Sequence, residues 1–173
     1  MRTLIVYESM FGSTEELARA VADGLGSADV VPVERAPHDL TGYDLLVVGA
    51  PTHVHGLSRP ATREAAADQA PAGTRTHELG AREWLGTLNV LPPGLDTAVF
   101  DTRLAKARWL TGSAAHAAAK LLRRLGHEPA VPPASFFVEV SGGDTRLVEG
   151  EPARAAAWGA DLAAVRQART GRS

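Results

Sequence analysis

The stretch Thr3-Leu4-Ile5-Val6-Tyr7-Glu8-Ser9-Met10-Phe11-Gly12-Ser13-Thr14 decides the fold class of this chain. It opens with apolar and β-branched residues, which are typical of a short strand that is buried on both faces. Beyond the stretch, apolar residues recur at helical spacing, at Leu17, Val21 and Leu25. A buried strand that leads through a short loop into an amphipathic helix indicates a parallel α/β sheet.

The rest of the chain continues this alternation of strands and helices. Further strands are predicted at 29–34, 44–49, 97–101 and 135–140, and helices at 62–69, 78–88, 113–126 and from Pro152 onward. A turn at 142–144 is expected to return the chain as a short hairpin arm at 146–148. We find no linker, internal repeat or low-complexity tract, and therefore expect a single domain over residues 1–173.

Composition and charge exclude several classes of protein. A chain of 173 residues that is 45% hydrophobic can bury a core, so neither disorder nor a small disulfide scaffold is expected. There is no cysteine, which excludes a cysteine nucleophile, a disulfide framework and Cys-ligated metal sites. The 18 basic and 20 acidic residues give a net charge of -2, without the basic footprint of a nucleic-acid-binding protein.

Hydropathy predicts no membrane segment. The apolar run near Met1 is too short for a signal-peptide core, and no stretch reaches the roughly 18 to 20 apolar residues of a membrane span. We therefore expect a cytoplasmic protein.

The loop at 9–14 is a candidate anion site, because backbone N–H groups and the helix dipole favour negative charge at such a position. Ser9, Ser13 and Thr14 add hydroxyl donors, and the absence of Lys and Arg from the loop speaks against a Walker-type nucleotide site. The loop suits one phosphate that is held by neutral donors. The alternative is simple helix capping, since Ser13-Thr14-Glu15-Glu16 fits the capping-box pattern.

Residues 5–15 resemble the phosphate loop of flavodoxins, which has the form Thr/Ser-x-Thr-Gly-x-Thr after the first strand. Ser9, Gly12 and Thr14 match this form, whereas Phe11 replaces the middle threonine. The resemblance continues at 44–56, where Gly49-Ala50-Pro51-Thr52 is similar to the Gly-x-Pro-Thr pattern of quinone-reductase relatives, and at 100–103, where the second flavin loop begins.

The resemblance implies a flavodoxin-like, doubly wound sheet of five parallel strands in the order 2-1-3-4-5, with helices on both faces. It also implies flavin mononucleotide (FMN) as the cofactor, bound where loops converge at the carboxyl ends of the strands. The implied FMN-binding residues are Ser9, Met10, Phe11, Gly12, Ser13 and Thr14 at the phosphate, Pro51, Thr52, His53, Val54, His55 and Gly56 at the isoalloxazine, and Asp101, Thr102 and Arg103 on its other side. The flavin supplies the electron or hydride transfer, so we assign no catalytic side chain.

Three functions stay open. The first is a flavoprotein that carries electrons between a redox partner protein or a small-molecule donor and an acceptor. The second is an FMN-dependent NAD(P)H:quinone-type oxidoreductase, so whether the chain is an enzyme is undecided at this point. The third is a flavin-free binding or regulatory domain, which Phe11 and the lack of aromatic residues in the flavin loops suggest.

Two clusters in the predicted loops have alternative interpretations. His53 and His55 would point the same way in an extended segment, but without a third ligand they do not justify a metal site. Arg103, Lys106 and Arg108 form either a solvated loop or a recognition site for an anionic substrate, a cofactor phosphate or an acidic redox partner.

The three tryptophans also differ in their expected roles. Trp84 and Trp158 lie on apolar helix faces and are predicted to be in the core. Trp109, in the long connection after the fourth strand, either folds back to stack on the flavin or covers the core or the surface.

Overall fold

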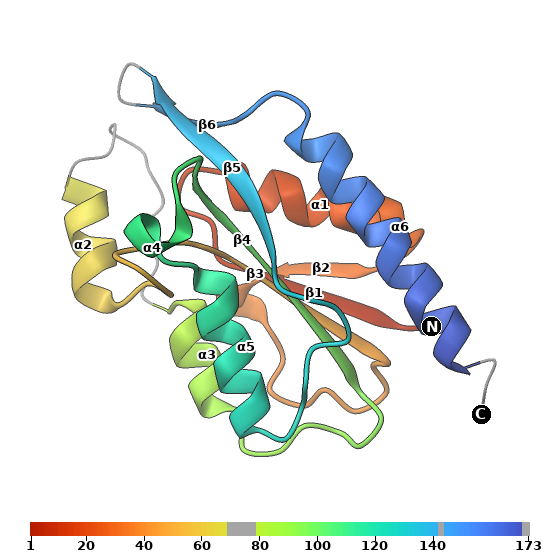
Figure 1. The fold of residues 1–173 in the computed structure, drawn as a ribbon. Helices are drawn as coiled ribbons and strands as arrows, with labels where there is room; N and C mark the ends of the chain where they lie inside the picture. The colour runs from red at the N-terminus through yellow and green to blue at the C-terminus, as the bar shows by residue number, and fades with distance from the viewer. Residues whose placement is uncertain (69–78, 142–143, 171–173) are drawn as a thin grey trace.

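Figure 1 shows the computed structural model, which describes residues 1–68, 79–141 and 144–170. One sheet with the strand order β2-β1-β3-β4-β5-β6 runs through the molecule. Its strands are β1 (Thr3–Tyr7), β2 (Asp29–Pro32), β3 (Leu45–Pro51), β4 (Asp96–Leu104), β5 (Ala134–Ser141) and β6 (Asp144–Leu147). The helices are α1 (Ser13–Leu25), α2 (Pro60–Asp68), α3 (Ala81–Thr87), α4 (Arg108–Thr111), α5 (Ala114–Arg124) and α6 (Glu151–Thr170), and a 3-10 turn, η1, spans Val33–Arg35.

The first five strands are parallel and have the predicted order, but the sheet has six strands rather than five. The sixth strand, β6, pairs antiparallel with β5, with Leu147 opposite Val138. It arises where the sequence indicates a hairpin arm, and antiparallel neighbours need no crossover helix between them. The predicted turn at 142–144 lies largely outside the described residues.

Helices cover both faces of the sheet, as expected (Figure 1). Alternate residues of the buried strands face opposite sides, so Leu4 and Val6 pack with α3 and α5. Ile5 and Tyr7 pack with α1 and α6 on the other face. The sheet therefore separates two apolar cores.

Tryptophan packing follows the sequence predictions for two of the three residues. Trp84 of α3 is fully buried. Trp158 of α6 packs edge to face against Phe100 and Phe136, with ring centroids 6.1 and 6.3 Å away. Trp109 is described below, because it lies on the surface.

Several strand ends differ from the sequence predictions, and β3 continues past the predicted end at 49 to Pro51. The predicted strand at 29–34 ends at Pro32, since the next three residues form η1. In contrast, β4 continues past the predicted end at 101, because Thr102 to Leu104 pair with Phe136 to Val138 of β5. This extension places the end of β4 beside the candidate site.

The helices predicted at 62–69 and 78–88 correspond to α2 and α3, which begin at Pro60 and Ala81. The segment between them, including the predicted helix end at 71–73, lies outside the described residues. No helix within the described ranges is long and apolar enough to cross a membrane.

Candidate functional site

A cavity of about 190 Å³ lies where β1, β3 and β4 end and α1 begins. Parallel strands expose their carboxyl ends at one edge of a sheet, and β1 and β3 lie at the point where strand order reverses. The residues that line it are Ser9, Met10, Phe11, Ser13, Thr14, Pro51, Thr52, His53, Thr102, Arg103, Leu104, Val138, Val140 and Thr145. Thus the cavity brings together residues of three segments that are distant in sequence and that the resemblance assigns to FMN.

The loop at 9–14 enters α1 through Gly12, which adopts the left-handed conformation with φ of 91°. No side chain caps α1, and the Gly12 N–H donates to the Ser9 hydroxyl at 3.1 Å. Ser13 is the first helical residue rather than the cap, so the capping-box alternative is wrong. The first-turn N–H groups of a helix have no acceptor within it, and here that turn forms part of the cavity wall.

A pair of hydroxyl groups joins this loop to β4. The Thr14 and Thr102 Oγ1 atoms lie 3.1 Å apart, and both residues are buried. The contact sets the distance between the N-terminus of α1 and the opposite cavity wall.

The segment after β3 forms a tight turn rather than the extended loop considered for its histidines. The backbones of His53 and Gly56 exchange hydrogen bonds of 2.8 and 3.0 Å. Val54 and His55 between them have φ of 40° and 70°. Consequently only His53 of this turn lines the cavity, whereas Val54, His55 and Gly56 do not.

Burial is the main cause that lowers the pKa of His53 below its ordinary value of 6.5. The negative charge of Glu8 opposes this shift, and the positive charge of Arg63 adds to it. A neutral imidazole therefore faces the cavity at neutral pH. Among the residues that the structure describes, no group of three or more His, Cys, Asp or Glu side chains is placed to hold a metal ion.

Asp101 does not line the cavity, although the sequence resemblance includes it in the site. Its buried Oδ2 atom accepts hydrogen bonds from the Ser113 hydroxyl at 2.5 Å, the Ala115 N–H at 3.0 Å and the Thr52 hydroxyl at 3.2 Å. A carboxylate is favourable at a helix N-terminus. Asp101 thus fixes the start of α5 and the end of β3, and its part in the site is positional.

Arg103 lies at the cavity wall with its guanidinium tied to its own loop. One terminal nitrogen donates to the Lys106 carbonyl at 2.6 Å, and the group lies 4.9 Å from the ring centre of Phe137. Its buried Nε has no hydrogen-bond partner among the described residues. The side chain therefore contributes a fixed positive charge and one donor that is not engaged.

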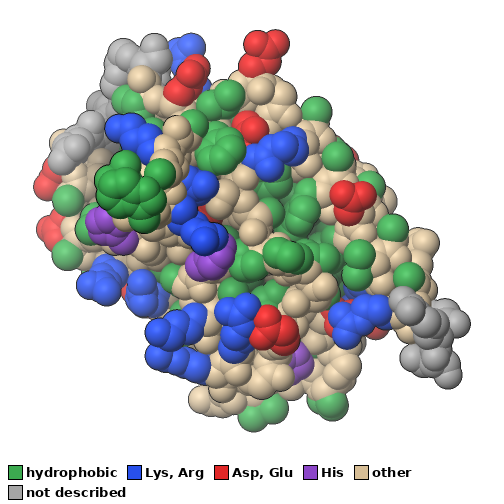
Figure 2. All heavy atoms as spheres, viewed as in Figure 1, with side chains coloured by type: hydrophobic (Ala, Val, Ile, Leu, Met, Phe, Trp, Pro, Cys, Tyr) green, Lys and Arg blue, Asp and Glu red, His purple; other side chains and the backbone are tan. Residues whose placement is uncertain are grey.

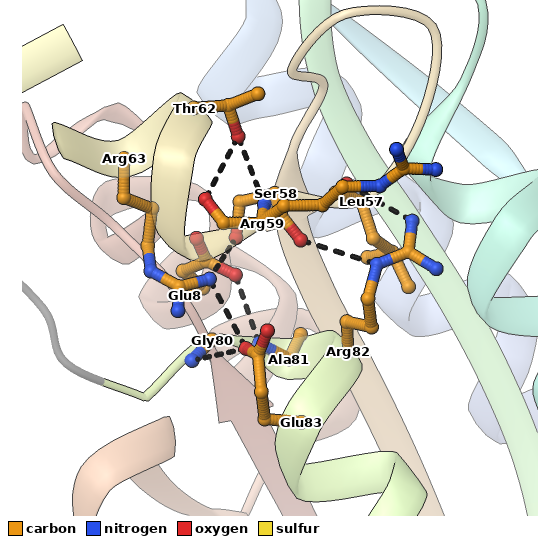
Figure 3. Close-up of polar contacts among 10 residues, drawn as sticks. All are labelled: Glu8, Leu57, Ser58, Arg59, Thr62, Arg63, Gly80, Ala81, Arg82 and Glu83. Atoms are coloured by element: carbon orange, nitrogen blue, oxygen red, sulfur yellow. Dashed lines mark hydrogen bonds and ion pairs between the residues drawn. The ribbon is translucent and has the colours of Figure 1, made fainter. Parts of the chain in front are cut away.

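Figure 3 shows a polar network where β1, the segment after β3, α2 and α3 meet. Glu8, next after β1, accepts the Ala81 N–H at 2.9 Å. Arg63 of α2 is buried and pairs with Glu83 of α3 at 3.0 Å.

Three further hydrogen bonds from arginines tie this network to the segment that follows the tight turn. Arg63 donates to the Ser58 hydroxyl at 2.8 Å. Arg82 donates to the carbonyl oxygens of Leu57 and Ser58 at 3.1 and 3.2 Å. The network therefore holds the turn against the rest of the fold.

Sequence reasoning missed four cavity residues: Leu104, Val138, Val140 and Thr145. Leu104 belongs to the unforeseen extension of β4, and Thr145 belongs to β6. Val138 and Val140 are two residues apart on β5 and hence point to one face. The alternation of Val138 and Val140 on the strand that follows the fourth one in the sequence is the signal that could have placed these two residues at the cavity.

Trp109 lies outside the cavity lining and is 81% exposed, so the proposed stacking over the site is not formed. It belongs to α4, a single turn of helix within the predicted long connection. Among the aromatic residues only Phe11 lines the cavity.

Comparisons with known proteins support the resemblance found in the sequence. Residues 5–80 match the family model for flavodoxin. Among curated proteins none matches the chain.

Solved flavodoxin structures superpose on nearly the whole chain. Flavodoxin 1 from Bacillus cereus has a TM-score of 0.64 at 17% identity, over 94% of this chain and 97% of that one. A flavodoxin from the domain Archaea has a TM-score of 0.63 at 17% identity, over 96% and 99% of the two chains. The two-electron reduced flavodoxin of Megasphaera elsdenii has a TM-score of 0.56 at 14% identity, over 92% and 98%. The chain therefore has the flavodoxin fold, and the resemblance to that family is confirmed.

Proposed function

We propose that this chain with the flavodoxin fold binds FMN in the cavity at the carboxyl edge of the sheet and carries electrons as a flavoprotein. The observation that supports the proposal most strongly is the uncapped N-terminus of α1, whose first turn forms a wall of that cavity. Such a terminus attracts an anionic phosphate group.

The residues around the cavity fit both ends of an FMN molecule. The hydroxyl groups of Ser9 and Ser13 supply neutral donors for a phosphate. Other residues of the lining are apolar and suit a flat ring system: Met10, Pro51, Leu104, Val138 and Val140. The backbone N–H groups of Thr52 and His53 already donate to Thr102 and Gly56. The polar edge of such a ring would therefore find donors in the His53 imidazole and at Arg103 Nε.

FMN, when bound, supplies one- or two-electron transfer. The side chains of this chain would position it and set its electrostatic surroundings. The positive charge of Arg103 at the cavity wall favours a more negative occupant. The half-buried, neutral His53 adds no opposing charge, and Thr14 with Thr102 fixes the wall nearest to α1.

The lining favours a second candidate, an NAD(P)H:quinone-type oxidoreductase. Phe11 is the only aromatic residue in the lining, and it is 43% exposed. A flavin with few aromatic neighbours leaves part of its surface for a flat substrate. Steady turnover of a quinone with reduced nicotinamide would assign the chain to this class, whereas electron exchange with a protein alone would assign it to the carriers.

The first experiment is the visible spectrum of the purified protein, followed by titration of its apo form with FMN. We expect a yellow protein, saturation at one FMN per chain, and a rise in melting temperature with added FMN because the ligand binds only the folded state. Thr14→Asp should abolish binding by placing a carboxylate beside the phosphate. The matched control is Thr41→Asp at an exposed position.

A colourless protein whose melting temperature ignores FMN would contradict the proposal. It would favour the flavin-free binding domain instead. Unchanged FMN affinity in Thr14→Asp would show that the phosphate does not bind at α1.

A further inference from the structure

The charges of this chain are segregated. Residues 102–127 contain six of the 18 basic residues and none of the 20 acidic ones. They lie in the end of β4, in α4, in α5 and in the loop between β4 and α4: Arg103, Lys106, Arg108, Lys120, Arg123 and Arg124. Figure 2 shows Lys and Arg side chains gathered over the α4 and α5 region, with few acidic side chains among them. Arg123 pairs with Glu128 just beyond this range, and the other five basic side chains give a near-neutral protein one basic face.

Large apolar side chains protrude from the same face. Trp109 is 81% exposed and Leu110 is 50% exposed, both on α4. The 79% exposed Val54 adjoins them, since the backbone of His55 bridges that of Gly112. Exposed tryptophan beside arginine is the composition of interface hot spots.

The helix that carries Trp109 is held in place by a chain of polar contacts. Arg108 lies 2.9 Å from His116 Nε2, and His116 Nδ1 lies 3.0 Å from the Ser113 hydroxyl. Ser113 donates to Asp101 at 2.5 Å. The arginine must donate, so the histidine donates through Nδ1 to Ser113. A surface that is ordered in advance loses less entropy when it binds.

We propose that the α4–α5 face is a docking surface for an acidic protein. The exposed tryptophan and leucine beside arginine suit a protein partner, and the charge of the face selects an acidic one. Arg103 and Leu104 line the cavity and lead directly into this face. That the partner exchanges electrons rests on the proposed function, whereas acidic docking at this face does not.

The test measures binding by isothermal titration calorimetry, which does not depend on flavin. The probes are a plant-type ferredoxin as an acidic redox protein and cytochrome c as a basic one, each added to the full chain. We expect ferredoxin to bind at low salt and its affinity to fall about tenfold or more when added salt screens the charges. Lys106→Glu and Trp109→Ala should each lower the affinity about tenfold.

Arg35→Glu is the matched control, because Arg35 is exposed in η1, which follows the edge strand β2 at the far end of the sheet from β5 and β6. It should leave ferredoxin binding nearly unchanged. Misfolding is not expected to explain a weaker affinity of Lys106→Glu, because the Lys106 side chain makes no described hydrogen bond. The far-UV spectrum of this variant should match that of the parent protein.

Several results would overturn the proposal: no ferredoxin binding at low salt, stronger binding of cytochrome c, or ferredoxin binding that ignores Lys106→Glu and Trp109→Ala. A DNA duplex is a further probe. If the protein bound the duplex and not ferredoxin, and both variants weakened duplex binding, the proposal would also be overturned, because the face would then recognise nucleic acid. Ferredoxin binding without any FMN binding would reject the cofactor and retain the docking surface. FMN binding without any ferredoxin binding would reject only the docking surface.

Discussion

Val54 occupies a backbone conformation that a β-branched residue rarely adopts, with φ of 40°. Two successive positive φ angles in a two-residue turn are typical of type I′, which favours Asn or Gly. The Val54 side chain is exposed, so its packing does not offset the backbone strain. The tight turn at 53–56 therefore holds stored strain next to the cavity.

Val54→Asn should raise the free energy of unfolding by about 1 kcal/mol, because asparagine tolerates this conformation. Urea unfolding measures the change. Val90→Asn is the control, since Val90 is an exposed valine without a positive φ. An equal effect of both substitutions would show that polarity rather than backbone strain is responsible.

Arg63 and Glu83 show how two side chains join whole elements. The arginine side chain is 3% exposed, and the ion pair connects α2 to α3 beside the end of β1 (Figure 3). Arg63→Met removes a buried partner of Glu83, whose side chain is itself 28% exposed and accepts the Gly80 N–H, so the substitution should cost about 2 to 3 kcal/mol of stability. Urea unfolding checks the loss. Arg63→Met with Glu83→Gln should recover part of it, and no recovery would show that the loss comes from packing.

Gly112 joins α4 to the tight turn at 53–56. It has φ of 71°, and a Cβ atom there would overlap the backbone of His55. Gly112→Ala should therefore destabilise the protein by about 2 kcal/mol and separate the turn from α4. Hydrogen exchange of the His53 and Gly56 amides should accelerate in the variant. Gly86→Ala is the control, because a Cβ atom there meets nothing within 4 Å. Unchanged exchange in Gly112→Ala would contradict the coupling of the two loops.

Elements that depend on local pattern were predictable from sequence, and those that depend on distant partners were not. The first strand and first helix follow from apolar spacing, and the loop between them carries the motif that located the cavity. Thr102 and Arg103 lack an apolar pattern, so the sequence predicts a loop there. They belong to a strand because they pair with β5. Asp101 was assigned to the cofactor, since no local signal shows that it caps a helix that starts 13 residues later.

At the scale of the whole molecule, one sheet separates two apolar cores, and basic side chains are concentrated on the α4–α5 face. Both cores use alternate residues of the same strands, for example Leu4 and Ile5. Loss of the helices on one face of the sheet would therefore expose strands that also support the core on the other face. We propose that residues 1–173 act as one domain, and expect a single cooperative unfolding transition.

The pH dependence of that transition should reflect two histidines. Burial lowers the pKa of His53, and burial followed by the charge of Arg108 lowers that of His116, both from the ordinary value of 6.5. The unfolded chain then binds protons at higher pH than the folded chain does, so stability is fully present above about pH 6.5 and falls as the pH drops below it.

Urea unfolding at pH 7.5 and 5.5 measures this slope. His53→Asn should make the loss of stability toward pH 5.5 smaller, because one group that resists protonation in the folded state is gone. His116→Asn should act in the same direction, although it also removes the contacts to Arg108 and Ser113 and so lowers stability at both pH values. His38→Asn, at an exposed position, is the control. A slope that persists unchanged in the His53 and His116 variants would show that other groups govern the acid sensitivity of the fold.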